Sequence, residues 1–255
     1  MMKLLRRMIA TAFLGFAPFA VASPCLPGTL ADYISLAAGC EIGSTLFAGF
    51  YVAPGQAAAT PIDPALVQVM PTGSAADPGL TFVLDLDALG GEFFESFFHY
   101  QVLAAAGVEL TGASLALDGS SAAGDGVAIA VQDLCLDGTF AMFEPVGCTG
   151  TPLALLAVAL EEFSSNDSAL FAGVSFIDVF VDLSVDGGLT GLAVLGSGTA
   201  QYATTATGTV PEPSTLALVL LALAVAACTR RDAGIGGRHR RMRPPPTRRD
   251  TMRGV

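Results

Sequence analysis

An alternation of apolar and polar residues with a period of two most constrains the fold of this chain. In the segment 177–186 every second residue is apolar, and most of the residues between them are polar, three of them aspartates. At this period one face of a β-sheet is buried, whereas at the helical period the aspartates would surround the whole surface. Similar runs cover residues 80–87, 97–103, 108–117, 127–136, 153–160 and 189–195. With turn signals such as Asp-Gly between them, about nine short strands predict an all-β, antiparallel β-sandwich over residues 23–196.

One short helix is expected before the strands. Leu30, Ile34 and Ala37 lie at helical spacing between Thr29 and Ala38, and a glycine follows as a stop signal.

Residues 1–22 have the order of a secretory signal peptide. Lys3, Arg6 and Arg7 precede an apolar run, which ends in small residues at 20–22. Signal peptidase requires this order, so we expect a signal-peptide helix that is cleaved after residue 22. An uncleaved anchor is the alternative, but the run is too short to span a membrane comfortably.

A second apolar segment, residues 215–228, is followed directly by Arg230 and Arg231. As a helix it would reach about 21 Å, less than the roughly 30 Å of the hydrocarbon core. It therefore predicts a short C-terminal transmembrane helix, with the arginine-rich end in the cytoplasm and the domain outside. A buried core helix is the alternative, but the arginines that follow leave no domain to cover it.

Positive charge is confined to the two ends of the chain. All 12 Lys and Arg lie in residues 3–7 or 230–253, and of the 23 Asp and Glu only Glu212, Asp232 and Asp250 lie outside residues 23–210, which leaves 20 inside. Such a domain repels polyanions, so nucleic acid, heparin-like chains and anionic lipid surfaces are poor candidates as partners. Its carboxylates must be solvated, hydrogen-bonded or neutralised by external cations.

Two segments near the C-terminus lack apolar alternation. Residues 197–209 are rich in Thr, Ser, Gly and Ala, and are expected to form a flexible spacer. Residues 232–255 are rich in arginine and proline, and are expected to be a disordered cytoplasmic tail.

Four cysteines lie in the exported region: Cys25, Cys40, Cys135 and Cys148. An even number in an oxidising compartment predicts two disulfides, for which three connectivities exist. Pairing Cys25 with Cys40 and Cys135 with Cys148 closes the shortest loops, and is the pairing that we favour.

The C-terminal elements also resemble a known family. The motif Val210-Pro211-Glu212-Pro213, the apolar segment and the basic cluster Arg230-Arg231 together resemble the PEP-CTERM sorting signal of Gram-negative bacteria over residues 210–231. The resemblance implies that an exosortase recognises residues 211–213 and that the protein then reaches the exopolysaccharide-rich surface. Such proteins usually end soon after the basic cluster, whereas this chain continues to Val255.

Residues for catalysis are scarce in the exported region. His99 is its single histidine and lies in a strand-like run, where a packed or edge residue is the simpler interpretation. Asp85 and Asp87 lie two apart on one strand, and acids on neighbouring strands would be needed to form a glycosidase pair. No phosphate-binding glycine loop or zinc-ligand spacing is present.

Calcium is the metal that these residues suit best. Glycine-rich turns and the strand between them carry Asp118, Asp125, Asp133 and Asp137, which offer oxygen ligands for weak extracellular sites. Solvated turns are the simpler account, and no cofactor is expected.

The sequence thus predicts an exported, non-enzymatic surface or extracellular-matrix protein. Its expected partners are signal peptidase, an exosortase and, through bridging cations, exopolysaccharide, with transient residence in the inner membrane. A secreted carbohydrate-active hydrolase with paired carboxylates and a permanently anchored adhesin are the alternative hypotheses.

Overall fold

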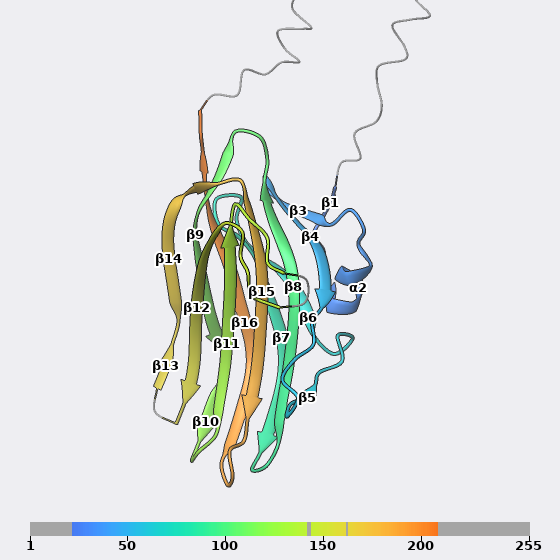
Figure 1. The fold of residues 1–255 in the computed structure, drawn as a ribbon. Helices are drawn as coiled ribbons and strands as arrows, with labels where there is room; N and C mark the ends of the chain where they lie inside the picture. The colour runs from blue at the N-terminus through green and yellow to red at the C-terminus, as the bar shows by residue number, and fades with distance from the viewer. Residues whose placement is uncertain (1–21, 142–143, 162, 209–255) are drawn as a thin grey trace, which may run out of the picture. The chain divides into compact units, whose positions relative to one another are not determined.

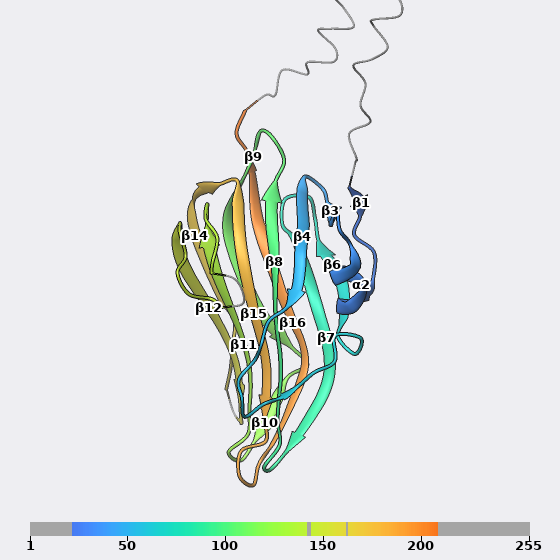
Figure 2. The same cartoon turned by 45° about the vertical axis from the view of Figure 1, so that its right-hand side comes forward.

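The computed structural model describes residues 22–141, 144–161 and 163–208. These residues form two β-sheets that pack face to face, with one short helix beside them (Figures 1 and 2). The prediction of an all-β antiparallel sandwich is confirmed. Both ends of the described domain, at β1 and at the end of β16, lie at the upper end of both views.

The larger sheet has nine strands. In spatial order they are β1 (Ser23–Pro24), β3 (Cys40–Ile42), β4 (Thr45–Val52), β8 (Phe93–Ala104), β15 (Phe176–Asp186), β11 (Val127–Leu136), β12 (Thr151–Leu160) and β13 (Phe163–Ser165), with β5 (Thr60–Pro61) paired to β8. Only two of its short pairings, β1 with β3 and β5 with β8, are parallel.

The smaller sheet has seven strands, all antiparallel. In spatial order they are β14 (Asp167–Val174), β9 (Val108–Asp118), β16 (Leu192–Ala206), β7 (Pro78–Leu89), β6 (Gln68–Gly73) and β2 (Gly28–Thr29), with β10 (Ser121–Ala123) paired to β16. Each run with period-two alternation contributes to a strand of one of the two sheets.

The prediction of a flexible spacer at residues 197–209 is wrong for most of its length. Residues 197–206 belong to β16, which pairs with β7 on one side and with β9 on the other. Small residues are needed there, because a Cβ on Gly198 would lie 2.7 Å from a methyl carbon of Leu183 in the opposite sheet. The loss of apolar alternation therefore marks a close sheet-to-sheet contact rather than a linker.

The predicted helix is present and shorter. α2 (Leu30–Ser35) begins with a capping box, in which Thr29 accepts a hydrogen bond from the backbone of Asp32 and the Asp32 carboxylate accepts one from Thr29. The buried residues are Leu30 and Tyr33, and Ile34 is 36% exposed. We expected Ile34 on the buried face of this helix, and this is wrong: the neighbouring residue Tyr33 is buried instead, because its ring packs edge-on against Phe50.

Two disulfides are present, with the pairing that closes the shortest loops. Cys25 is bonded to Cys40 and holds β1 next to β3, whereas Cys135 is bonded to Cys148 and closes the loop after β11.

A polar network crosses the core between the sheets. The hydroxyls of Tyr100 and Tyr202 lie 2.7 Å apart, and Gln132 donates from its amide nitrogen to the Tyr202 hydroxyl at 2.5 Å. All three residues are fully buried, so these hydrogen bonds fix one register of β8, β11 and β16.

Replacing Tyr202 with Phe should lower the free energy of unfolding by about 1–2 kcal/mol, because buried partners lose their hydrogen bonds. Urea denaturation measures the loss. Tyr33→Phe is the control: its hydroxyl donates to Leu26 at a part-buried site, where water can replace it. Equal losses in the two variants would contradict a special role for the central network.

Candidate functional site

The most unusual surface is the outer face of the nine-stranded sheet, which points away from the seven-stranded sheet. On β15 the inward residues, such as Val179 and Val181, are buried as predicted. However, the outward Asp178, Phe180 and Ser184 are also at least nine-tenths buried. The expectation of one wet face is therefore wrong for this strand, because two loops cover it.

The first covering loop, residues 53–62, is called the strap. Its backbone amides donate to main-chain oxygens of β8, from Ala53 to Phe97 and from Ile62 to Glu95. The Gln56 amide also donates to Glu95 Oε2. The strap lies so close that a Cβ on Gly55 would overlap this carboxylate oxygen. These contacts bury the Glu95 side chain almost completely.

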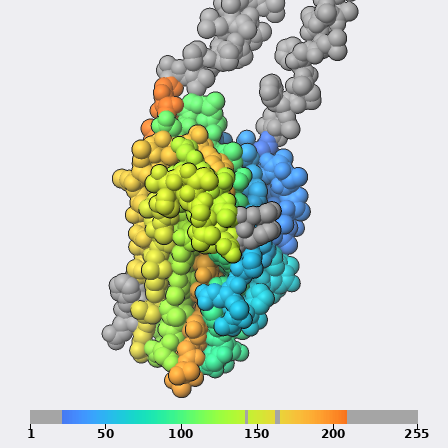
Figure 3. All heavy atoms as spheres, in the orientation of Figure 1, coloured from blue at the N-terminus to red at the C-terminus, as the bar shows by residue number. Residues whose placement is uncertain are grey.

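The second covering loop follows β11 and is closed by the Cys135–Cys148 disulfide. Phe140 packs edge-on against Phe180 and donates its backbone amide to Asp178 at 2.9 Å. Figure 3 shows this yellow-green segment in front of the sheet and the cyan strap beside it.

His99 is fixed between two acceptors under these loops. Its Nε2 lies 2.6 Å from Asp178 Oδ1, and its Nδ1 lies 3.1 Å from the carbonyl oxygen of Gly49. Only the doubly protonated ring donates to both. Burial raises the pKa of Asp178, but the hydrogen bonds from His99 and Phe140 outweigh it and hold the pKa below its ordinary value. The ring also stacks on Tyr51, so the packed-residue interpretation of His99 fits its surroundings.

Further along the same face lies a cluster of three carboxyl groups from three adjacent strands: Glu95, Asp182 and Asp133. Burial raises the pKa of Asp182 to about 7, and the charge of Glu95, a hydrogen bond to it and the charge of Asp133 act in the same direction. Burial also raises the pKa of Asp133. Two neighbouring carboxyl groups do not both ionise readily, so Asp182 keeps its proton up to near-neutral pH.

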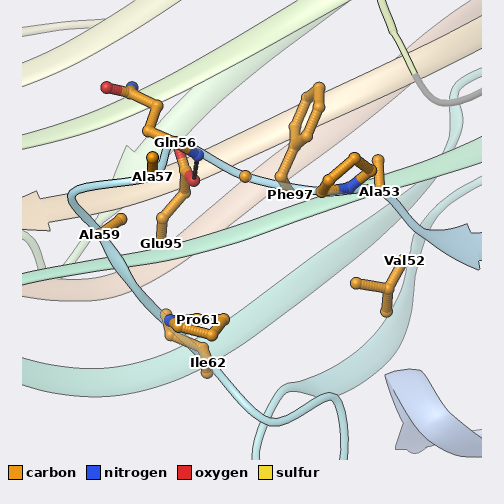
Figure 4. A pocket seen from close by; sticks show the side chains of 11 residues that line it. Val52, Ala53, Gln56, Ala57, Ala59, Pro61, Ile62, Glu95 and Phe97 are labelled. Carbon is orange, nitrogen blue, oxygen red and sulfur yellow. Dashed lines mark hydrogen bonds between the residues drawn. The ribbon is translucent and has the colours of Figure 1, made fainter.

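Two hollows flank this cluster. One of about 480 Å³ lies under the strap, and the other, of about 230 Å³, is bounded by Asp133, Pro145 and Asp182. Gly55, Gln56, Glu95 and Phe97 line both. Figure 4 shows the first hollow, with the Glu95 carboxylate beneath the strap and Phe97 beside it. The surface thus offers carboxyl, amide and aromatic groups side by side.

The four calcium candidates do not come together. Asp125 accepts hydrogen bonds from the amides of Leu189 and Thr190, which lower its pKa. Asp137 accepts from Ser175, whereas Asp118 ends β9 and Asp133 belongs to the carboxyl cluster. Within the part of the chain that the structure describes, no three His, Cys, Asp or Glu are arranged to hold a metal ion. Backbone amides donate hydrogen bonds to the two turn aspartates, Asp125 and Asp137.

The carboxyl cluster was not predicted from the sequence. Asp85 and Asp87 were the candidate pair, and both lie exposed on β7. One sequence feature could have indicated that this face is covered. Phe97, His99 and Phe180 lie at outward positions of β8 and β15, and large aromatic side chains at such positions indicate a face that is shielded from water.

Comparison with protein families gives one match. Residues 209–231 match the PEP-CTERM protein-sorting motif, which confirms the resemblance found in the sequence. The motif lies outside the described residues, as do Val210, Pro211, Glu212, Pro213, Arg230 and Arg231. No helix among the described residues has the length and apolarity of a membrane span.

Comparison with curated proteins finds no match. Among solved structures, the chain is similar to TmCBM61 in complex with β-1,4-galactotriose, with 17% identity, coverage of 53% of this chain and 81% of that chain, and a TM-score of 0.25. Trichoderma harzianum endoglucanase 3 from family GH12 gives 11% identity, 64% and 92% coverage, and a TM-score of 0.24. These scores are too low to support a functional inference.

Asp182→Asn should make the protein more stable at alkaline pH. The pKa of Asp182 is about 7 in the folded protein and about 3.8 in the unfolded chain. The stabilisation that protonated Asp182 gives the folded state is therefore complete below about pH 3.8 and is lost as the pH rises through about 7. After allowance for its partial exposure, the variant should gain about 1–3 kcal/mol near pH 8 and little near pH 4. Urea denaturation across this range measures the difference.

The matched control is Asp87→Asn, at an exposed position on β7. Its unfolding free energy should follow the wild type at each pH within about 0.5 kcal/mol. If Asp182→Asn also followed the wild type, the carboxyl group would not be held protonated by its surroundings.

Proposed function

We propose that this PEP-CTERM motif-containing protein is a non-enzymatic component of the cell surface or extracellular matrix. It is exported, an exosortase removes its C-terminal anchor, and the released domain associates with exopolysaccharide.

The observation that carries this proposal is the sorting motif at residues 209–231, which follows the last strand of the sandwich almost directly. The motif indicates an exported protein with a transient C-terminal anchor. Two disulfides support residence in an oxidising compartment. The absence of Lys and Arg from residues 8–229 disfavours polyanionic partners unless cations intervene.

The geometry of the outer face supports a role without catalysis. Glu95 is 4% exposed, and its carboxylate is engaged by the Gln56 amide of the strap. Both His99 nitrogens are engaged with Asp178 and Gly49, so this histidine is not free to act as a general base.

A carbohydrate-active hydrolase is the second candidate, because a carboxyl group whose pKa is raised to about 7, as in Asp182, beside a second carboxyl group is also the arrangement of a general acid. Glu95→Gln distinguishes the two functions. If the protein is an enzyme, glycan turnover by the wild type disappears in this variant. If it is a structural protein, the wild type gives no turnover either.

The proposal predicts a processed C-terminus. Mass spectrometry of the protein from cells with an exosortase should find a chain that ends at or near residues 211–213, in the polymer fraction rather than the membrane. Without the exosortase, or with Pro211→Ala and Pro213→Ala together, the chain should extend to Val255 and stay in the membrane.

Pro244→Ala, in the arginine-rich tail, is the control and should be processed like the wild type. An identical C-terminus with and without the exosortase would contradict the proposal. Permanent retention of the anchor in wild-type cells would instead favour the anchored adhesin.

A further inference from the structure

We propose that the strap is a proton-dependent cover. It lies closed on Glu95 while Asp182 in the carboxyl cluster keeps its proton, and it lifts from the outer face of the nine-stranded sheet when that proton is lost. This inference concerns the exported domain itself and holds whether or not the domain binds exopolysaccharide.

The strap is held to the sheet by few contacts. Beyond the two-residue pairing of β5 with β8, three of its amides bond to β8, and one of these bonds goes to the Glu95 carboxylate. At its two ends Ala53 is buried and Ile62 packs against the core, but residues 54–61 between them carry no large apolar side chain. A segment with so little buried apolar surface opens at a small free-energy cost.

Glu95 couples the strap to the cluster. The same carboxylate accepts the Gln56 amide on one side and interacts with Asp182 on the other. Asp182 Oδ1 is enclosed and has no hydrogen-bond donor within the described residues. A proton on Asp182 makes this carboxyl group neutral and leaves a single negative charge, that of Glu95, under the strap.

Loss of that proton to solvent leaves Glu95 and Asp182 both ionised, with Asp133 beside them. No cation compensates for these charges. The strap carries no titratable side chain, and the loop closed by the Cys135–Cys148 disulfide, called the disulfide loop, contributes Pro145 to the hollow of about 230 Å³. Glu144, next to it, is exposed, and His99 is already paired with Asp178. Two buried like charges in contact require water, and water reaches Glu95 when the strap moves away.

The pKa of Asp182, raised by burial to about 7, sets the range in which this change occurs. The strap is therefore closed in mildly acidic surroundings and open in alkaline ones. Opening exposes Glu95 and Phe97, because the strap forms the opposite wall of the hollow that these two residues line.

Hydrogen–deuterium exchange of the purified full chain, followed by peptic digestion, tests the inference. Protection of peptides from the strap, corrected for intrinsic exchange, should fall by ~10-fold or more between about pH 5.5 and about pH 8.5, whereas peptides from β12 should not change. Asp182→Asn should keep the strap protected at both pH values, because the neutral side chain still donates to Glu95.

Two further variants complete the test. Gly55→Ala should lose strap protection already at low pH, because its Cβ would overlap the Glu95 carboxylate, with β12 unaffected. Asp87→Asn should keep the wild-type response. Equal strap protection at the two pH values in the wild type, or an unchanged pH response in Asp182→Asn, would overturn the proposal.

Discussion

The absence of lysine and arginine from residues 8–229 is the constraint on which the arrangement of polar groups in this domain depends. With 20 acidic residues between positions 23 and 210, carboxylates need partners other than cationic side chains. Backbone amides donate hydrogen bonds to the carboxylates of Asp32 and Asp125, and His99 is paired with Asp178. At Asp182, where a second carboxyl group lies beside it and no such donor is found among the described residues for its Oδ1, burial raises the pKa to about 7 and a proton takes the place of a partner.

This constraint explains why the outer face of the nine-stranded sheet is a second, polar layer rather than an exposed surface. The strap and the disulfide loop bring amides to Glu95 and Asp178, and Phe140 covers Phe180. The layer is thus built from hydrogen bonds and aromatic contacts on one side of the sheet, while β15 buries Val179 and Val181 in the main core on the other side. This domain, which a sorting motif follows in the sequence, therefore has one sheet face covered by two loops. In the account proposed above, the charge of the carboxyl groups beneath the strap decides whether that face is exposed.

The sequence was sufficient for the sandwich, because period-two alternation is visible wherever one face of a strand is apolar, as in β7, β11 and β15. The local disulfides and the capped helix were predicted for similarly local reasons. The covered outer face was not predicted from the sequence. An aspartate at position 182 fits the same apolar–polar alternation whether water or a loop lies above it. The strap has no periodic pattern, and Gly198 in β16 is small because of a neighbour in the other sheet. Such contacts join residues far apart in the chain, and alternation along one strand does not report them.

The central claim is that a proton, rather than a cation, neutralises the buried carboxylates. Carbon-13 NMR titration of the Asp and Glu carboxyl groups in the isotope-labelled full chain tests it most directly. One aspartate resonance should titrate at about 7, and it should be missing from the spectra of Asp182→Asn. Titration of every carboxyl group below about pH 5, as for ordinary solvated acids, would contradict the account.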